Sequence, residues 1–322
     1  MPSGRRALIT GIAGQDGSYL AELLVAEGYE GAGLVRPPAR RPLANLAAVQ
    51  GAVRLLEGDL LDPGSLRRAV AAVRPHELYH LAAPTFVPAS WEDPTETMAA
   101  IAVATATLLG AARATDPQTR VWIAASSEVF GAAGESPQHE GSPMRPRTPY
   151  GVAKLAAHGL AATMRERHGT FVCSGIAYNH ESPRRPARFL SRKVSRAAAA
   201  IRLGRQDELL LGDLEAVRDW SHAADAVRAM RLALAHEEPA DYVVSSGVGR
   251  TVADLVRVAF AHVGLDPDDH VHTDPALVRR PEPTALVGDP TRARRVLGWS
   301  AERSFEDMVG EMVDADLAAL RG

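Results

Sequence analysis

The sequence predicts an α/β protein with a doubly wound parallel sheet and a smaller α/β lobe in its C-terminal half. Through the first half of the 322 residues, short apolar runs alternate with longer amphipathic stretches. Strands that alternate with helices in this way are typical of parallel sheets covered on both faces. The pattern changes at a loop over 179–188 that is dense in Pro and Arg. We therefore expect a sheet domain over 1–178 and a second lobe over 179–322, interleaved with the last strands of the sheet.

The individual elements follow from local patterns of apolar residues and of residues that end helices. Apolar runs predict strands over 6–10, 33–35, 53–56, 77–81 and 121–124. Amphipathic stretches predict helices over 18–27, closed by Gly28, and over 96–114, 149–168, 189–204, 251–263 and 304–320. After about residue 178 the sequence predicts shorter strands and helices, which include the last three of these helices.

Composition and charge exclude several kinds of function. The chain is 46% hydrophobic and 23% charged, as ordinary soluble globular proteins are. A net charge of -3 argues against a nucleic-acid surface, which normally carries a basic excess. The sequence has no run of about 18 uninterrupted apolar residues, so no membrane span is expected.

The cysteine and histidine content predicts neither a disulfide nor a metal site. The single cysteine, Cys173, allows no intrachain disulfide and fits a reducing compartment. With no apolar leader core before the first strand, we expect a cytoplasmic protein. The 11 histidines show no paired ligand spacing, so no metal site is expected. His180, His222 and His262 are interpreted as structural or surface residues.

A glycine-rich turn joins the first predicted strand to the first predicted helix. Gly11, Gly14 and Gly17 are spaced G-x-x-G-x-x-G, which permits a tight turn and a close approach of the backbone to a pyrophosphate. The N-terminus of the following helix supplies free N–H groups and the positive end of its dipole. The pattern predicts a Rossmann-type dinucleotide site in the first domain. The alternative is a glycine-rich turn that binds no ligand.

The end of the second strand distinguishes between the two nicotinamide cofactors. An acidic residue there binds the adenine ribose hydroxyls and repels a 2′-phosphate. The strand instead ends at Arg36, and Arg40 and Arg41 follow, so NADP is favoured over NAD, with Arg36 as the phosphate partner. A solvated basic loop is the alternative. The residues expected to line the cofactor are Gly11, Gly14, Gln15, Asp16, Gly17, Arg36, Asp59, Leu60, Leu81, Ala82, Ala83, Tyr150 and Lys154.

A tyrosine and a lysine four residues apart form the core of a candidate catalytic site. Tyr150 and Lys154 share one face of the helix over 149–168. The lysine cation is expected to lower the pKa of the phenol, so that Tyr150 takes a proton from a sugar hydroxyl while hydride leaves the same carbon. A chance pair on a helix surface is the alternative, but Ser126 at the end of the preceding strand favours a site.

Glu128 adds a group that a simple dehydrogenase does not need. It follows the strand over 121–124, at the edge of the sheet where doubly wound folds build their sites. Oxidation of C4 of a hexose makes the C5 proton acidic, and a carboxylate there can remove it while water leaves C6. We therefore interpret Glu128 as an acid/base for elimination, with a surface carboxylate as the alternative.

These motifs together resemble the GDP-mannose 4,6-dehydratases of the extended short-chain dehydrogenase/reductase family. The matching segments run from about residue 6 to 300. They are Gly17-Ser18-Tyr19-Leu20, Ser126-Ser127-Glu128, Tyr150 with Lys154, Asn179-His180-Glu181-Ser182-Pro183-Arg184-Arg185, Val217-Arg218-Asp219-Trp220, Gly288-Asp289-Pro290 and Leu297-Gly298-Trp299. The Asn179 to Arg185 string is the most specific of them.

The resemblance implies a lyase, with Ser126, Glu128, Tyr150 and Lys154 catalytic and Ser126 standing where the family usually has Thr. It also implies that Arg185 lies near the cofactor phosphate. The residues implied to bind the nucleotide sugar are Thr85, Ser127, Asn179, Lys193, Arg218, Arg279 and Glu282. For each arginine, an exposed salt bridge is the alternative.

Four departures from the family pattern leave the sugar and the assembly open. Pro84-Thr85-Phe86 replaces a polar Gln-Ser-His, Ile101 replaces an Asp or Asn, and Pro186-Ala187-Arg188 replaces Gly-Glu-Thr. The loop after Arg36 is also shorter than in the family. A different nucleotide sugar is therefore an alternative substrate.

Other functions remain open on the same fold. UDP-glucuronate decarboxylases also carry a Ser/Thr-Ser-Glu segment, and related epimerases share the Tyr and Lys. A non-catalytic NADP-binding sensor is an alternative of another class. The helices over 97–113 and 149–168 resemble those that form a four-helix dimer interface, so we expect a homodimer, with a homotetramer as the alternative.

Overall fold

Seven parallel strands form the central sheet of the protein, a computed structural model of which describes residues 4–37, 43–278 and 284–321. The strand order is β10-β6-β5-β4-β1-β2-β3, and every neighbouring pair is parallel. The predicted doubly wound α/β fold is therefore confirmed. The strands are β1 (Arg6–Thr10), β2 (Glu30–Val35), β3 (Val53–Glu57), β4 (Glu77–His80), β5 (Arg120–Ala124), β6 (Val172–Ala177) and β10 (Asp241–Val244).

The side on which successive strands join the sheet changes between β1 and β4. The chain runs outward from β1 through β2 to β3, then returns to place β4 on the other side of β1. In open α/β sheets, ligands bind outside the carboxyl ends of the strands at such a switch point. The turn after β1 and the loop after β4 are therefore where a cofactor is expected.

Helices cover both faces of the sheet, because alternate strand residues point to opposite sides. Ile9 packs into one core with α1 (Gln15–Ala26) and α7 (Ala223–Ala235). Leu8, its neighbour, packs into a second core with α2 (Pro63–Val73), α4 (Ala104–Thr115) and α5 (Pro149–His168). Strands buried on both faces account for the nearly continuous apolar runs in the sequence.

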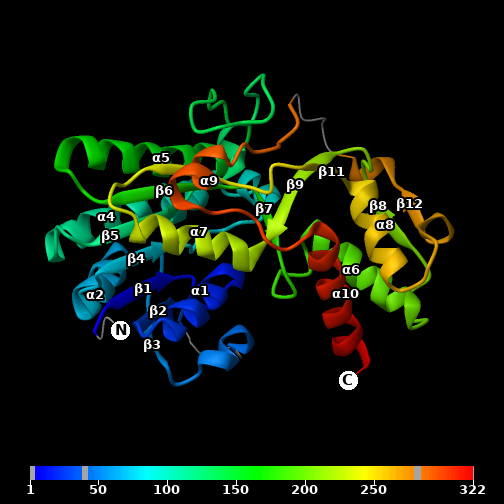
Figure 1. Ribbon diagram of the computed structural model, residues 1–322, viewed down its shortest axis with the longest axis horizontal. Coiled ribbons are helices and arrows are strands. Elements are labelled where there is room, and N and C mark those ends of the chain that lie inside the picture. The colour runs from blue at the N-terminus through cyan, green and yellow to red at the C-terminus, as the bar shows by residue number, and fades with distance from the viewer. Residues whose placement is uncertain (1–3, 38–42, 279–283, 322) are drawn as a thin grey trace.

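A second lobe lies beside the sheet, on the right in Figure 1. Its core joins α6 (Leu190–Arg202), α8 (Val252–His262) and α10 (Phe305–Arg321). Two small sheets complete it: β7 (Asn179–Glu181) with β9 (Val217–His222) and β11 (Gly249–Thr251), and β8 (Leu209–Leu211) with β12 (Val271–Thr273).

The predicted helix over 96–114 is divided into three parts. α3 (Pro94–Met98) leads into a π-helical turn over Ala99–Val103, which continues as α4. By length and composition, Pro94–Thr115 is apolar enough to cross a membrane, but 56% of its most apolar window is buried within the fold. Its apolar residues therefore serve the core against α2 and α5.

Several elements lie where the sequence patterns predicted none, or begin earlier than predicted. α1 starts at Gln15 and not at residue 18. No bounds were predicted for α2, α7, α9 (Thr291–Leu297) or the strands β6 and β10. α2 has a clear start, because Asp62 accepts a hydrogen bond from the Gly64 amide and Pro63 occupies the first turn.

Candidate functional site

The glycine turn after β1 is shaped for a close backbone approach. Gly11 has a φ of 73°, and a Cβ there would lie 3.0 Å from the Ala82 backbone. At Gly17 a Cβ would lie 2.2 Å from the Gly11 carbonyl oxygen, so only glycine fits. α1 begins at Gln15 with no side-chain cap on its first amides. Uncapped amides beside a bare backbone cradle fit the pyrophosphate of a dinucleotide.

A hydrogen-bonded cluster fixes the loop after β4 against this turn. Thr10 Oγ1 accepts hydrogen bonds from the Leu81 and Ala82 amides, both at 3.1 Å, and lies 2.8 Å from His80 Nδ1. Burial, reinforced by the Lys154 charge, lowers the pKa of His80 to about 3, so its ring is neutral. Leu81, Ala82 and Ala83 thus lie beside the glycine turn, as expected for residues that line a cofactor.

The residues predicted for the adenine end follow β2 and β3. Arg36 is exposed directly after β2. Asp59 follows β3, and its carboxylate accepts a hydrogen bond of 2.9 Å from the Leu61 amide. Leu60, the residue after Asp59, is half-buried. Arg40 and Arg41 lie outside the described residues.

The start of α5 places the predicted tyrosine and lysine beside the carboxyl end of β5. Thr148 caps the helix by accepting a hydrogen bond of 3.0 Å from the Gly151 amide. Tyr150 and Lys154 are both buried, and the Lys154 Nζ lies 5.7 Å from the centroid of the Tyr150 ring. Lys154 donates a hydrogen bond of 2.6 Å to the Ala124 carbonyl at the end of β5. This bond orients the ammonium beneath the phenol.

Burial shifts the pKa values of both groups in ways that the sequence did not predict. Burial raises the pKa of Tyr150 to about 12, although the Ser126 hydroxyl and the Arg185 charge oppose it. Burial also lowers the pKa of Lys154 to about 8. The expectation that Lys154 holds the tyrosine pKa below its ordinary value is therefore wrong for the protein alone. Formation of the phenolate needs further positive charge or a bound substrate.

Ser126 and Glu128 reach the same place from the end of β5. The Ser126 Oγ caps a short 3-10 turn over Ser127–Val129, accepting a hydrogen bond of 3.3 Å from the Glu128 amide. Thr148, at the start of α5, donates a hydrogen bond of 3.4 Å to Glu128 Oε2. The half-buried Glu128 also raises the pKa of Tyr150 by its charge. The four predicted catalytic residues are thus brought together where β5 ends and α5 begins.

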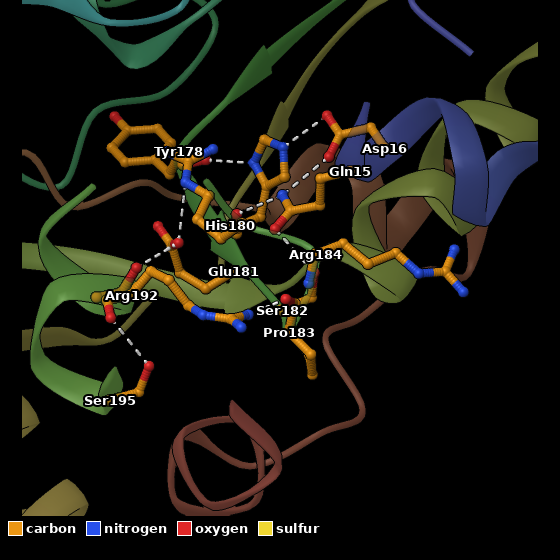
Figure 2. A network of polar contacts seen from close by, with 12 residues as sticks. Gln15, Asp16, Tyr178, His180, Glu181, Ser182, Pro183, Arg184, Arg192 and Ser195 are labelled. Atoms are coloured by element: carbon orange, nitrogen blue, oxygen red, sulfur yellow. Dashed lines mark hydrogen bonds and ion pairs between the residues drawn. The ribbon is translucent and has the colours of Figure 1, made fainter. Parts of the chain in front are cut away.

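The segment after β6 is joined to the N-terminus of α1 by a polar network (Figure 2). His180 Nε2 lies 2.8 Å from Asp16 Oδ2, and its Nδ1 lies 2.7 Å from the Tyr178 carbonyl oxygen. Gln15 donates a hydrogen bond of 2.9 Å to the His180 carbonyl and accepts one of 2.8 Å from Ser182. The network holds the second lobe against the predicted pyrophosphate site.

The His180–Asp16 pair changes the pKa of both partners. Burial lowers the pKa of His180, but the Asp16 carboxylate and its hydrogen bond outweigh this and raise it. Burial raises the pKa of Asp16, but His180 outweighs this and lowers it. His180 is therefore a structural residue, as interpreted, but one that fixes the cofactor turn. Its place in the string after Asn179 was the only sequence signal.

Two arginines of the same segment have different partners. Arg184 donates hydrogen bonds to Ser18 (2.9 Å) and to Glu22 (2.7 Å) on α1. Arg185 Nε lies 3.1 Å from the buried carboxylate of Glu181. Sequence reasoning gave no role to Arg184, which anchors the segment to α1. Arg185 lies close enough to Tyr150 to influence its ionisation.

The residues predicted to hold the nucleotide sugar come from both lobes. Asn179 on β7 is in register with Trp220 on β9, which places Arg218 on the same small sheet. Lys193 on α6 is hydrogen-bonded to the Leu210 carbonyl at 2.6 Å. Thr85 is exposed in the loop after β4. Arg279 and Glu282 lie outside the described residues.

A buried aspartate that sequence reasoning missed keeps β9 in place. Asp219, 1% exposed, accepts hydrogen bonds from Ser246 and from the Gly247 and Gly288 amides. It therefore fixes the strand that carries Arg218. Over the ranges that the structure describes, no group of His, Cys, Asp and Glu is arranged to hold a metal ion.

A family model described as "GDP-mannose 4,6 dehydratase" matches residues 8–312 of the chain. The chain belongs to this family. GDP-mannose 4,6 dehydratase 2 of Arabidopsis thaliana is 42% identical over 97% of this chain and 86% of its own. The enzyme of Sinorhizobium fredii is 40% identical over 100% of this chain and 99% of its own. The Homo sapiens enzyme is 38% identical over 98% of this chain and 92% of its own. The resemblance predicted from the motifs is confirmed.

Solved structures similar to this member of the GDP-mannose 4,6 dehydratase family carry nicotinamide cofactors of both kinds. The RMD of Pseudomonas aeruginosa, complexed with NADPH, is 26% identical with a TM-score of 0.81 over 98% of this chain and 99% of its own. UDP-glucose 4-epimerase of Thermus thermophilus, complexed with NAD, is 26% identical with a TM-score of 0.84 over the same shares. One neighbour is thus complexed with NADPH and the other with NAD on this fold.

Proposed function

We propose that the protein converts GDP-mannose to GDP-4-keto-6-deoxymannose with a tightly held nicotinamide cofactor. The observation that carries the proposal is the position of Glu128. It lies beside Ser126, Tyr150 and Lys154 at the edge of the sheet, above a dinucleotide turn, in a chain of the GDP-mannose 4,6 dehydratase family. A simple dehydrogenase has no use for this additional carboxylate, and the Asn179 to Arg185 string and Arg218-Asp219-Trp220 argue against an epimerase and a decarboxylase.

Each residue then has one task in the reaction. A nicotinamide held by the glycine turn and by Leu81 to Ala83 would supply the acceptor of the C4 hydride and the donor of that hydride to C6. Tyr150 takes the proton of the C4 hydroxyl, while Ser126 hydrogen-bonds the C4 oxygen. Glu128 removes the C5 proton, which the C4 ketone has made acidic, and protonates the C6 hydroxyl so that it leaves as water. Tyr150 gives up the proton that it took from the C4 hydroxyl, and C5 regains one proton when C6 is reduced, so Tyr150 and Glu128 both end in their initial states.

We further propose NADP as the cofactor in preference to NAD. An exposed arginine, Arg36, follows β2 at the place where an acidic residue selects NAD. The uncapped N-terminus of α1 and the bare turn at Gly11 would hold the pyrophosphate. Leu81 to Ala83 would flank the nicotinamide, and Asp59 the adenine.

A dehydratase for another nucleotide sugar is the second candidate, because one pocket wall is apolar. Phe86, in the loop after β4, packs edge-on against Phe189 at the start of α6, so its side chain offers a sugar hydroxyl no hydrogen-bond partner and the exposed Thr85 offers the one hydroxyl of this segment. Ile101, by contrast, is buried in the core with Tyr150 and does not bear on the choice of sugar.

We propose that the protein is a cytoplasmic homodimer joined through α4 and α5. The π-helical turn before α4 exposes Val103 (52%) and α5 exposes Val152 (45%), on faces that also carry Gly110 and Gly159, respectively. Added Cβ atoms at these two glycines would meet nothing within 4 Å. Small residues let helices of a second copy approach closely. Val152→Glu is therefore expected to yield a monomer in gel filtration, and an unchanged elution volume would contradict this interface.

Mass spectrometry of GDP-mannose incubated with the protein and NADP tests the proposed function. We expect a product lighter by one water, with no net formation of NADPH. A product of unchanged mass would identify an epimerase, and a decarboxylase would instead release carbon dioxide when UDP-glucuronate replaces GDP-mannose. If cofactor binds but a panel of nucleotide sugars is never turned over, the protein is a sensor and not an enzyme.

A further inference from the structure

Two loops beside the catalytic residues meet in a stack of aromatic rings and guanidinium groups. Phe86, after β4, lies edge-on to Phe189, which precedes α6, with ring centroids 5.9 Å apart and planes at 88°. The Arg188 guanidinium lies 5.2 Å from the Phe86 centroid and 5.6 Å from that of Phe189. The Arg185 guanidinium lies 3.8 Å from the Phe189 centroid. All three arginine contacts are within the range of cation–π attraction.

The two residues that join the loops are both departures from the family pattern. Phe86 ends the segment that replaces Gln-Ser-His, and Arg188 ends the segment that replaces Gly-Glu-Thr. They are far apart in the sequence, yet the fold brings one over the other. We therefore regard them as one feature of this chain and not as two unrelated substitutions.

The stack acts on Arg185. One side of this residue is fixed by Glu181, whose buried carboxylate also accepts a hydrogen bond of 2.5 Å from Ser191. The guanidinium also lies over the Phe189 ring. Backbone hydrogen bonds fix the main chain of Phe189 at the start of α6, and its half-buried ring packs against Phe86 and Arg188. Loss of either would leave Arg185 with the Glu181 ion pair as its main restraint.

The position of Arg185 matters because its charge reaches the catalytic tyrosine. It is the cation that lowers the pKa of Tyr150, against a larger rise caused by burial. Two carboxylates oppose Arg185 by raising the same pKa, and the Ser126 hydroxyl supports it. The groups that affect the ionisation of the Tyr150 phenol are Ser126, Glu128, Asp16 and Arg185, and the Lys154 Nζ lies 5.7 Å from the centroid of its ring.

We propose that Phe86 and Arg188 are positioning residues, which hold Phe189 and through it the Arg185 guanidinium within electrostatic reach of the Tyr150 hydroxyl. The proposal rests on Tyr150 acting as the base of the proposed function. Its structural part, the placement of Arg185, does not depend on the substrate.

Phe86→Ala tests the proposal without changing any charge. If Arg185 moves away, the phenolate loses a stabilising cation and the pKa of Tyr150 rises. The limb of the kcat–pH profile that reports Tyr150 should then shift upward by about half a unit, which is roughly a threefold loss of turnover below the pKa. Arg188→Ala should do the same. Arg188→Lys should also shift the limb, because an ammonium keeps the charge but lacks the planar guanidinium.

Two comparisons separate positioning from a general loss of structure. In an Arg185→Ala background, Phe86→Ala should cause no further shift, since both act through one group. Arg231→Ala is the matched control, because it removes an arginine 5.3 Å from the Tyr29 ring at the opposite end of the sheet. It should leave the pH profile unchanged. An unshifted profile for Phe86→Ala, or a shift that persists without Arg185, would overturn the proposal.

A crystal structure of Phe86→Ala separates this proposal from the proposed function. We expect the Arg185 guanidinium to be displaced from the Phe189 ring. If it keeps its place, the positioning role is wrong whatever the substrate proves to be. If wild-type protein never turns over GDP-mannose, the proposed function fails, and the structure of the variant alone then decides the positioning role.

Discussion

Gly17→Ala is the change in the dinucleotide turn with the clearest structural consequence. The new Cβ would lie 2.2 Å from the Gly11 carbonyl oxygen and 2.6 Å from Ile12 Cα. Both are backbone atoms, so neither can rotate away. Restoring a contact of about 3 Å requires α1 to move by at least about 0.8 Å against β1. Alanine regains about 1 kcal/mol of helix propensity, while overpacking costs about 1–3 kcal/mol.

The displaced helix should bind a dinucleotide poorly. Loss of one charge-assisted hydrogen bond to the pyrophosphate costs about 1.5–3 kcal/mol, which weakens NADP binding roughly tenfold to a hundredfold. Calorimetric titration with NADP measures this, and thermal denaturation shows that the variant still folds. Gly141→Ala is the control, because the atoms nearest its Cβ belong to the exposed His139 ring, 3.1 Å away, which can rotate aside. A Gly17→Ala protein that binds NADP within about twofold of wild type would refute the reasoning.

Three further variants test the site. Glu128→Gln should lower turnover by about 10²–10⁴-fold with NADP binding intact, while the exposed Glu135→Gln should be active; equal activity of the two in a product assay would contradict the acid/base role. Tyr150→Phe should abolish turnover and leave the NADP affinity unchanged in a titration. Asp16→Asn should lower the free energy of unfolding, measured by urea denaturation near pH 6, by about 1–2 kcal/mol. The reason is that the raised pKa of His180 and the lowered pKa of Asp16 make their ion pair stabilising between about pH 4 and 7. The difference should narrow at higher pH, as His180 loses its proton; a difference independent of pH would count against the ion pair.

Local signals predicted much of the fold and brought out the catalytic residues. The helix over 149–168 has the predicted bounds because Thr148 caps it, Pro149 starts it and Gly169 ends it. The end of β5 and the start of α5 carry Ser126 and Tyr150, respectively, and a parallel sheet brings such points to one edge. The parallel strand order therefore explains why residues that lie apart in the sequence, such as Ser126 and Tyr150, come together in one site.

Features that depend on tertiary packing could not be predicted from the sequence. The His180–Asp16 contact joins residues 164 positions apart, and no periodicity indicates such a pair. The high pKa of Tyr150 follows from burial, whereas the sequence showed only its distance from Lys154. The stack of Phe86 on Arg188 likewise requires two loops to meet. The start of α2 at Asp62, by contrast, carried a cap signal that sequence reasoning overlooked.

The central claim is that oxidation at C4 and reduction at C6 occur in one site with one cofactor. Incubation of the protein with GDP-mannose carrying deuterium at C4, followed by NMR of the product, tests this most directly. The account predicts deuterium in the C6 methyl group of the product, undiluted by added unlabelled NADPH. Deuterium that stays at C4, or that passes into the free cofactor, would contradict it.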